Sequence, residues 1–222
     1  MIRLLFLIIL FSHLCFQCKA KQEDKKISLN SYTSALDVPL RNTGVVISID
    51  SVTFFKQENM NKDDISNKVL QSIHSINKNF DLETVITNKV KSILNEKNIK
   101  YSIIEEINQD DFPNELITKK NINTVDFKSI KEKHKVDDLI ILNIKNGFDY
   151  KHDDPKNNKN FVAKTFLELN ILDLNEEKLK FAENIGGVRF LDEPIDSINQ
   201  KHLENIMGKS INETIEIIAK KY

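Results

Sequence analysis

The position of the cysteines is the feature that most constrains how this chain can fold. Cys15 and Cys18 are the only two, and both precede residue 21. A domain formed by the rest of the chain therefore contains no disulfide, and its hydrophobic core alone must hold it together. The chain has 222 residues, of which 40% are hydrophobic, with only 5 glycines and 4 prolines. That length and composition are sufficient for one well-buried globular domain.

An apolar run near the N-terminus predicts export. Arg3 precedes an unbroken apolar segment over residues 4–11, and a strongly charged stretch follows soon after. The run is shorter than the roughly 20 apolar residues that a membrane-spanning helix needs, and it is typical of the core of a signal peptide. We therefore expect residues 1–20 to be a signal segment, residues 21–43 a polar tether, and residues 44–222 a single domain.

Two forms of processing remain open at the end of the signal segment. The residues Cys18-Lys19-Ala20 resemble a cleavage site with small residues at the required positions, and cleavage there would release the chain. Alternatively, Cys18 resembles the lipid-modified cysteine of a bacterial lipoprotein, although Gln17 stands where that motif prefers a small residue. In the second case, the expected contact with a membrane is only through a lipid attached to Cys18.

Hydrophobic periodicity predicts an α/β (α+β) fold with the order β-α-α-β-α-β-β-β-α. Alternating or β-branched runs predict strands over residues 45–54, 101–107, 139–144, 161–174 and 178–185. Apolar residues at helical spacing predict helices over residues 63–76, 81–98, 126–135 and 197–220. We expect a mixed sheet that ends in an antiparallel meander, with the helices packed mainly on one face. Gly186 and Gly187, after the last strand, predict a turn or a bulge.

Charge and motifs exclude several classes of function. The chain carries 32 Lys and Arg against 33 Asp and Glu, so it lacks the basic excess with which proteins bind nucleic acid. It has no glycine-rich loop of the kind that holds phosphates, and no serine stands in a recognisable nucleophile turn. The sequence therefore predicts no cofactor and no catalytic residue.

One acidic loop could hold a metal ion. The possible ligands are carboxylates and an imidazole, which suit hard cations or transition metals, and they are Asp149, His152, Asp153 and Asp154. The lysines at 151, 156 and 159 lie in the same polar loop and compete with a metal for these carboxylates. We interpret the loop as a solvated hairpin connection. The alternative is an exported hydrolase or metal-dependent enzyme that uses residues 149–154.

Three stretches of the chain carry a resemblance to a known group of domains. They are the strand Ile141-Leu142-Asn143-Ile144, the long hairpin over 161–185 with Asp173-Leu174-Asn175 at its turn, and the closing amphipathic helix. In this order they resemble the α/β domain of the TolB amino-terminal region, of the curli secretion lipoprotein and of related bacterial envelope lipoproteins. The resemblance implies a non-catalytic accessory or assembly role in the cell envelope, periplasmic or at the outer membrane, through contact with an envelope protein. It assigns no functional residues.

Overall fold

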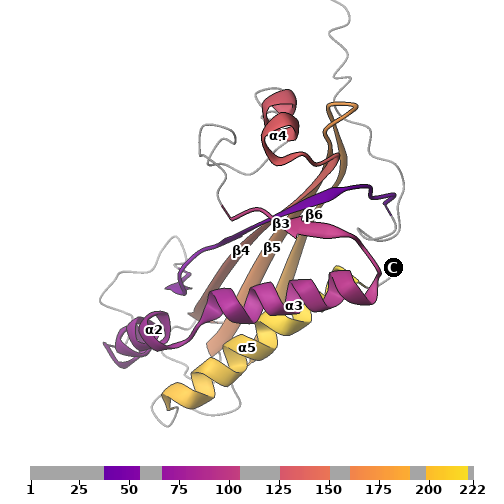
Figure 1. Cartoon of the computed structure of the whole chain (residues 1–222). Helices are drawn as coiled ribbons and strands as arrows, with labels where there is room; N and C mark the ends of the chain where they lie inside the picture. The colour runs from indigo at the N-terminus through magenta and orange to yellow at the C-terminus, as the bar shows by residue number, and fades with distance from the viewer. Residues whose placement is uncertain (1–37, 56–66, 106–125, 151–160, 191–198, 220–222) are drawn as a thin grey trace, which may run out of the picture.

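The computed structural model describes residues 38–55, 67–105, 126–150, 161–190 and 199–219. These residues form a six-stranded mixed sheet with four helices, which confirms the α/β fold class (Figure 1). The strands are β1 (Thr43–Ile49), β2 (Thr53–Phe54), β3 (Tyr101–Ile103), β4 (Asp138–Tyr150), β5 (Phe161–Asp173) and β6 (Lys178–Phe190). The helices are α2 (Asn67–Asn79), α3 (Leu82–Glu96), α4 (Phe127–His134) and α5 (Gln200–Ile217).

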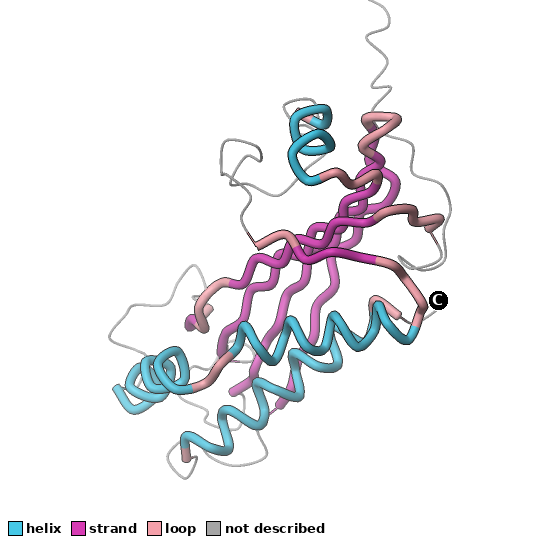
Figure 2. Tube along the Cα trace, in the orientation of Figure 1, coloured by secondary structure: helices cyan, strands magenta, loops and turns pink. Residues whose placement is uncertain are grey.

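The strand order is β3-β1-β4-β5-β6, with β2 paired to β4 outside this path. β1 runs parallel to both β3 and β4, whereas β4, β5 and β6 form the expected antiparallel meander. In Figure 2 the strands, in magenta, form one layer with α3 and α5 along one side of it. The parallel pairs need long connections, which α2, α3 and α4 provide, while β5 and β6 are joined by a tight turn. The pairing pattern thus follows from the order of helices and strands along the chain.

The expected strand over 45–54 is divided into β1 and β2, and the side chain of Asn77 explains the division. Val52, between the two strands, donates its backbone N–H to Asn77 Oδ1 at 2.8 Å and accepts a hydrogen bond at 2.8 Å from Asn77 Nδ2. A buried peptide group must be paired. The α2 side chain supplies this pairing where the sheet does not.

Three helices cover one face of the sheet, and the fourth lies against the other face. α2, α3 and α5 enclose the main core, which includes Ile86, Leu142, Leu169 and Met207. α4 packs at one end of the opposite face, in a smaller cluster that contains Phe127, Ile130, Val136, Leu139, Ile141, Leu172 and Leu179. The helices therefore lie mainly on one face, as expected, and a large part of the other face carries no described helix (Figure 1).

The helices α3, α4 and α5 begin where polar side chains can cap them. Asp81 accepts a hydrogen bond from the backbone N–H of Thr84 at 3.0 Å, and Asp126 accepts one from that of Ser129 at 2.9 Å. Asn199 caps α5 in the same way, with His202 as donor. Each cap satisfies an N–H group that the helix itself leaves unpaired.

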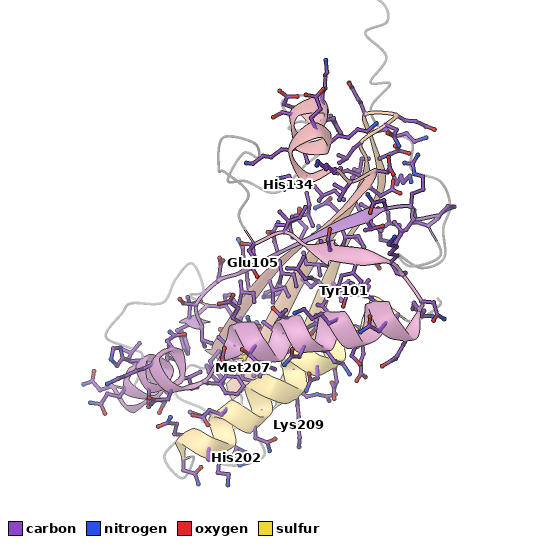
Figure 3. The ribbon with its side chains drawn as sticks, in the orientation of Figure 1. Tyr101, Glu105, His134, His202, Met207 and Lys209 are labelled. Atoms are coloured by element: carbon purple, nitrogen blue, oxygen red, sulfur yellow. The ribbon has the colours of Figure 1, made fainter. Side chains whose placement is uncertain are left out.

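A seam of small and polar residues lets α5 approach β6 closely. Thr165 and Ser210 share a buried hydrogen bond of 3.0 Å between their hydroxyl groups, and the Thr214 hydroxyl donates to the Ser210 carbonyl at 2.7 Å. A Cβ atom on Gly187 would overlap the Thr214 hydroxyl and lie 3.2 Å from the Ser210 carbonyl oxygen. Along the same helix Met207 is buried, whereas Lys209 points away from the sheet (Figure 3). The absence of a side chain at Gly187 thus fixes how α5 sits on the sheet.

Two buried aspartates face each other at one end of the sheet. Asp138 in β4 lies directly opposite Asp173 in β5, and both side chains are almost fully buried. Arg41 Nη2 lies 2.8 Å from Asp138 Oδ1 and 2.7 Å from Asp173 Oδ1. Lys180 Nζ lies 2.6 Å from Asp138 Oδ1 and 3.4 Å from Asp173 Oδ2. The two cations neutralise a pair of carboxylates that would otherwise repel each other.

The position of each cation has a structural cause. The pairing of β5 and β6 shifts between Ile171 and Leu172, so Lys180 has no partner residue in β5 and forms a bulge.

Arg41 belongs to residues 38–43, which the sequence places in the polar tether. In the structure, these residues also contribute Val38 to the core. This ion-paired group of Asp138, Asp173, Arg41 and Lys180 is called the aspartate clasp below.

We expect Gly187→Ala to reduce the free energy of unfolding by about 1–3 kcal/mol, the usual cost of an extra group in a packed interface. Gly186→Ala is the matched control, because a Cβ atom there lies 3.7 Å from the Phe166 ring, an ordinary contact. Urea unfolding of both variants measures the difference. Equal losses of stability would show that α5 does not depend on Gly187.

The aspartate clasp predicts a specific dependence of stability on pH. Burial raises the pKa of Asp173, but the Glu176 N–H and the Arg41 guanidinium lower it more, to about 2. Because this value lies below that of an unfolded aspartate, the stabilisation is complete above pH ~4 and is lost as the pH falls towards 2. The loss from this group is about 2–3 kcal/mol.

Arg41→Ala should move this loss of stability to higher pH, because it removes a charge that holds both carboxyl groups ionised. Urea unfolding between pH 2 and 7 provides the measurement. Lys128→Ala is the control, since its pairing with Glu132 is exposed and lies at 3.9 Å. An unchanged pH profile in Arg41→Ala would contradict the role assigned to the clasp.

Candidate functional site

The candidate site is the part of the sheet that faces away from α2, α3 and α5 and lies beyond α4. Its side chains come from alternate positions of β4, β5 and β6, because successive residues of a strand point to opposite faces. We call this surface the open face and define it by Asn143, Lys145, Phe166, Glu168, Asn184, Gly186 and Val188. Within the described part of the chain, no helix packs over these residues.

Large apolar side chains are exposed on the open face. Phe166 and Val188 are each 45% exposed, and Leu70 on α2 is the one other large hydrophobic residue that is exposed among those described. Apolar groups on a sheet face between polar residues are typical of a contact surface. The open face therefore differs from the rest of the described surface by this pair.

The ring of Phe166 is held in place by one aromatic contact. It meets the ring of Phe55 edge to face, with 5.4 Å between centroids and an interplanar angle of 82°. Phe55 can approach the sheet because Gly147 has no side chain: a Cβ atom there would lie 2.6 Å from the Phe55 ring. Gly186 lies directly opposite Phe166 in β6 and has no side chain, so the other side of the ring stays accessible. The aromatic group is thus fixed before any partner binds, which reduces the entropy cost of binding.

A shallow hollow of about 400 Å³ lies beside this ring, between the three strands. Its lining includes the amides of Asn143 and Asn184 and the charged groups of Lys145 and Glu168. Burial raises the pKa of Glu168, while a hydrogen bond from Asn170 and the charge of Lys145 act in the opposite direction. Apolar, amide and charged groups together provide both the contact area and the hydrogen bonds that a protein partner requires.

The structure places the metal-ligand candidates of the sequence in different settings. Asp149 lies within β4 rather than in a loop, and its side chain is ion-paired with Lys164 of β5. His152, Asp153 and Asp154 lie outside the described residues, as does Cys18. Among the residues that are described, no three His, Cys, Asp or Glu side chains gather in an arrangement that could hold a metal ion. His134 on α4 and His202 on α5 lie at opposite ends of the molecule (Figure 3).

The prediction of a turn at Gly186 and Gly187 is wrong. β6 continues through both glycines to Phe190, and both pair with β5, opposite Phe166 and Thr165. The two glycines serve packing on opposite faces: Gly187 admits α5, and Gly186 lies beside Phe166 on the open face. Phe166 is not among the site residues that the sequence predicts. The available signal was an aromatic residue between Lys164 and Glu168, on the otherwise polar side of an alternating strand.

A second concave region lies at the carboxyl ends of the parallel strands β1 and β3, beside the first turn of α3. It is a groove of about 870 Å³, with Asp50, Asp81 and Glu105 among its lining residues. Ligands often bind at such strand ends in α/β proteins. Here, however, the Asp81 carboxylate already caps α3. We therefore base no function on the groove.

No helix in the described part of the chain is both long and apolar enough to cross a membrane. No protein-family model matches the chain, and no curated protein matches it.

Solved structures resemble the chain only distantly. A protein of Chlamydia trachomatis described as hypothetical, CT253, is 12% identical with a TM-score of 0.40, over 79% of this chain and 93% of its own. A minor lipoprotein of Acinetobacter baumannii is 9% identical with a TM-score of 0.38, over 82% and 90% of the two chains. Lipoprotein GNA1162 of Neisseria meningitidis is 11% identical with a TM-score of 0.35, over 79% and 99%.

Bacterial lipoproteins are thus among the structures to which this chain is similar. With TM-scores below 0.5 and identities near 10%, they assign neither a function nor site residues to it.

Proposed function

We propose that this chain is an exported protein of the bacterial cell envelope that acts through protein contacts and without catalysis. The contacts are made by the open face and by the adjoining strand β6. The exposure of Phe166 and Val188, on a sheet face that no described helix covers, is the observation that carries this proposal. Exposed apolar groups next to a hollow lined with amides favour a surface for binding another protein.

The envelope location is supported by the N-terminal residues. Their apolar run, followed soon after by a charged stretch, favours export, and Cys18 is the candidate for lipid attachment. Val38 lies in the core and Arg41 in the aspartate clasp, so the domain includes the chain from Val38 onwards. We expect the polar residues between Cys18 and Val38 to act as the tether. A lipid at Cys18 would hold the domain at a membrane without a membrane-spanning helix.

Fractionation of a Gram-negative host that produces the chain tests the location. The mature protein should have lost 17 or 20 N-terminal residues, as measured by its intact mass. If a lipid is attached at Cys18, Cys18→Ser should move the protein from the membrane fraction to the soluble one, whereas Cys15→Ser should not. Full-length protein that keeps Met1 and stays in the cytoplasm would contradict export.

Site-specific photo-cross-linking tests the contact surface. A benzophenone amino acid at position 166 in producing cells should yield a discrete adduct with another protein, because the side chain is exposed on the proposed surface. Position 70 is the matched control: Leu70 is 42% exposed, close to the value for Phe166, but lies on α2. Absence of any adduct at 166, or equal adducts at both positions, would contradict the proposal.

A further inference from the structure

The outer edge of β6 is open over most of its length. β6 is the last strand of the sheet, and among the described residues nothing pairs with its outer side. The bulge at Lys180 disturbs only its first part, so residues 181–190 run regularly beside β5. These ten residues contain no proline and no lysine, the residues with which proteins usually protect an edge strand. An edge of this length and regularity is suited to pair with another strand.

The charges along this edge match the edge of a second copy. If two copies of β6 pair antiparallel with Gly186 opposite Gly186, each Glu183 lies opposite Arg189 of the other copy, because both are three residues from the centre. Both residues lie on the side of the sheet that α5 covers. The Arg189 side chain is 43% exposed and is ion-paired with Glu213 of α5 within one copy, so Glu183 of the other copy would be a second carboxylate at this guanidinium. Among the described residues, Glu183 has no ion-pair partner of its own. Opposite charges placed directly across two strands stabilise their pairing.

The centre of this pairing also suits a second copy. Gly186 brings no side chain, so the two strands can meet there without a clash on the open face. The Phe166 rings of the two copies would be three strand spacings apart, about 14 Å, on either side of this glycine pair. The two open faces would then form one surface, with an exposed aromatic ring on each half.

The helices are compatible with the same arrangement. α5 packs over β5 and β6, so a two-fold axis at the β6 edge would bring the two α5 helices side by side on the covered face. Strands are about 4.8 Å apart, so two helices placed over the last two strands of each copy would lie about 10 Å apart, a normal packing distance. The pairing therefore buries helix surface in addition to forming backbone hydrogen bonds.

We propose that two copies of this chain pair antiparallel along β6 over residues 182–190, about a two-fold axis at Gly186, and form one continuous sheet. This inference rests on the proposed function, because it names a second copy of the chain as one protein partner of the open face and β6. The pairing joins the two open faces, and this combined surface is what a further envelope protein would meet.

Cysteine cross-linking tests the register directly, because the domain itself contains no cysteine. In the full chain with Cys15→Ser and Cys18→Ser, Gly186→Cys should form a disulfide-linked dimer on mild oxidation. Residues opposite each other in an antiparallel pair have Cα atoms about 4.5–5.5 Å apart, within the range for a disulfide. A side chain at 186 meets only an ordinary contact within the monomer.

Two controls make the test specific for the register. Ala182→Cys in the same background should give no dimer. Residue 182 lies opposite residue 190 of the other copy, so the two cysteines would be eight residues apart along the paired strands. A mixture of Asn184→Cys and Val188→Cys chains should cross-link to each other, and each alone should not. Dimers of Ala182→Cys as abundant as those of Gly186→Cys, or no dimer of Gly186→Cys, would overturn the proposal.

A charge reversal provides a second test that needs no new cysteine. Glu183→Arg would place two arginines opposite each other, so the dissociation constant of the dimer, measured by sedimentation, should rise at least tenfold. Glu132→Arg on α4 is the control and should leave the dissociation constant unchanged.

The experiments distinguish failure of self-pairing from failure of the proposed function. If Gly186→Cys gives no dimer while the adduct at position 166 persists, self-pairing is wrong and the proposed function stands. If the dimer forms without that adduct, the wider proposed function fails and self-pairing stands.

Discussion

The ionic contacts at one end of the sheet hold the segment that precedes the first strand against the rest of the domain. Asp138 and Asp173 are directly opposite each other and almost fully buried, an arrangement that is unfavourable without cations. Arg41 comes from the segment before β1 and Lys180 from a bulge in β6, so one group of charges joins three distant parts of the chain. A domain without cysteine has no disulfide to fix its first strand, and the clasp serves this purpose.

At the other end, the seam between α5 and β6 determines which face of the sheet remains uncovered. Close approach at Gly187 and the hydroxyl groups of Ser210 and Thr214 hold α5 over the last two strands. Because α2 and α3 pack around the same helix, three helices lie on this face. In the described part of the chain, the opposite face carries only α4, at the end near the clasp, and so Phe166 and Val188 are exposed. The surface that we propose for protein contacts is therefore a consequence of where α5 packs on the sheet.

Local patterns in the sequence predict much of the fold but little of the site. The caps and apolar stripes of α3 and α5 depend on residues close in the chain, as does the β5–β6 hairpin, and these elements are confirmed. Features that depend on distant residues were missed. Nothing near Val52 shows that Asn77 divides the first strand, and nothing near Arg41 shows that it pairs with Asp138. For the same reason, the sequence pattern predicts a turn at the glycines of β6, because their packing partners, Phe166 and Thr214, are remote in sequence.

The central claim is that the β6 edge is a surface for strand pairing, and backbone hydrogen exchange measures this directly. In an edge strand, alternate N–H groups point to solvent and exchange quickly unless another strand accepts their hydrogen bonds. Exchange in the intact chain should therefore slow within residues 182–190 as the protein concentration rises, while the rates in β3, at the opposite edge, stay constant. Exchange in β6 that is fast and independent of concentration would contradict the account.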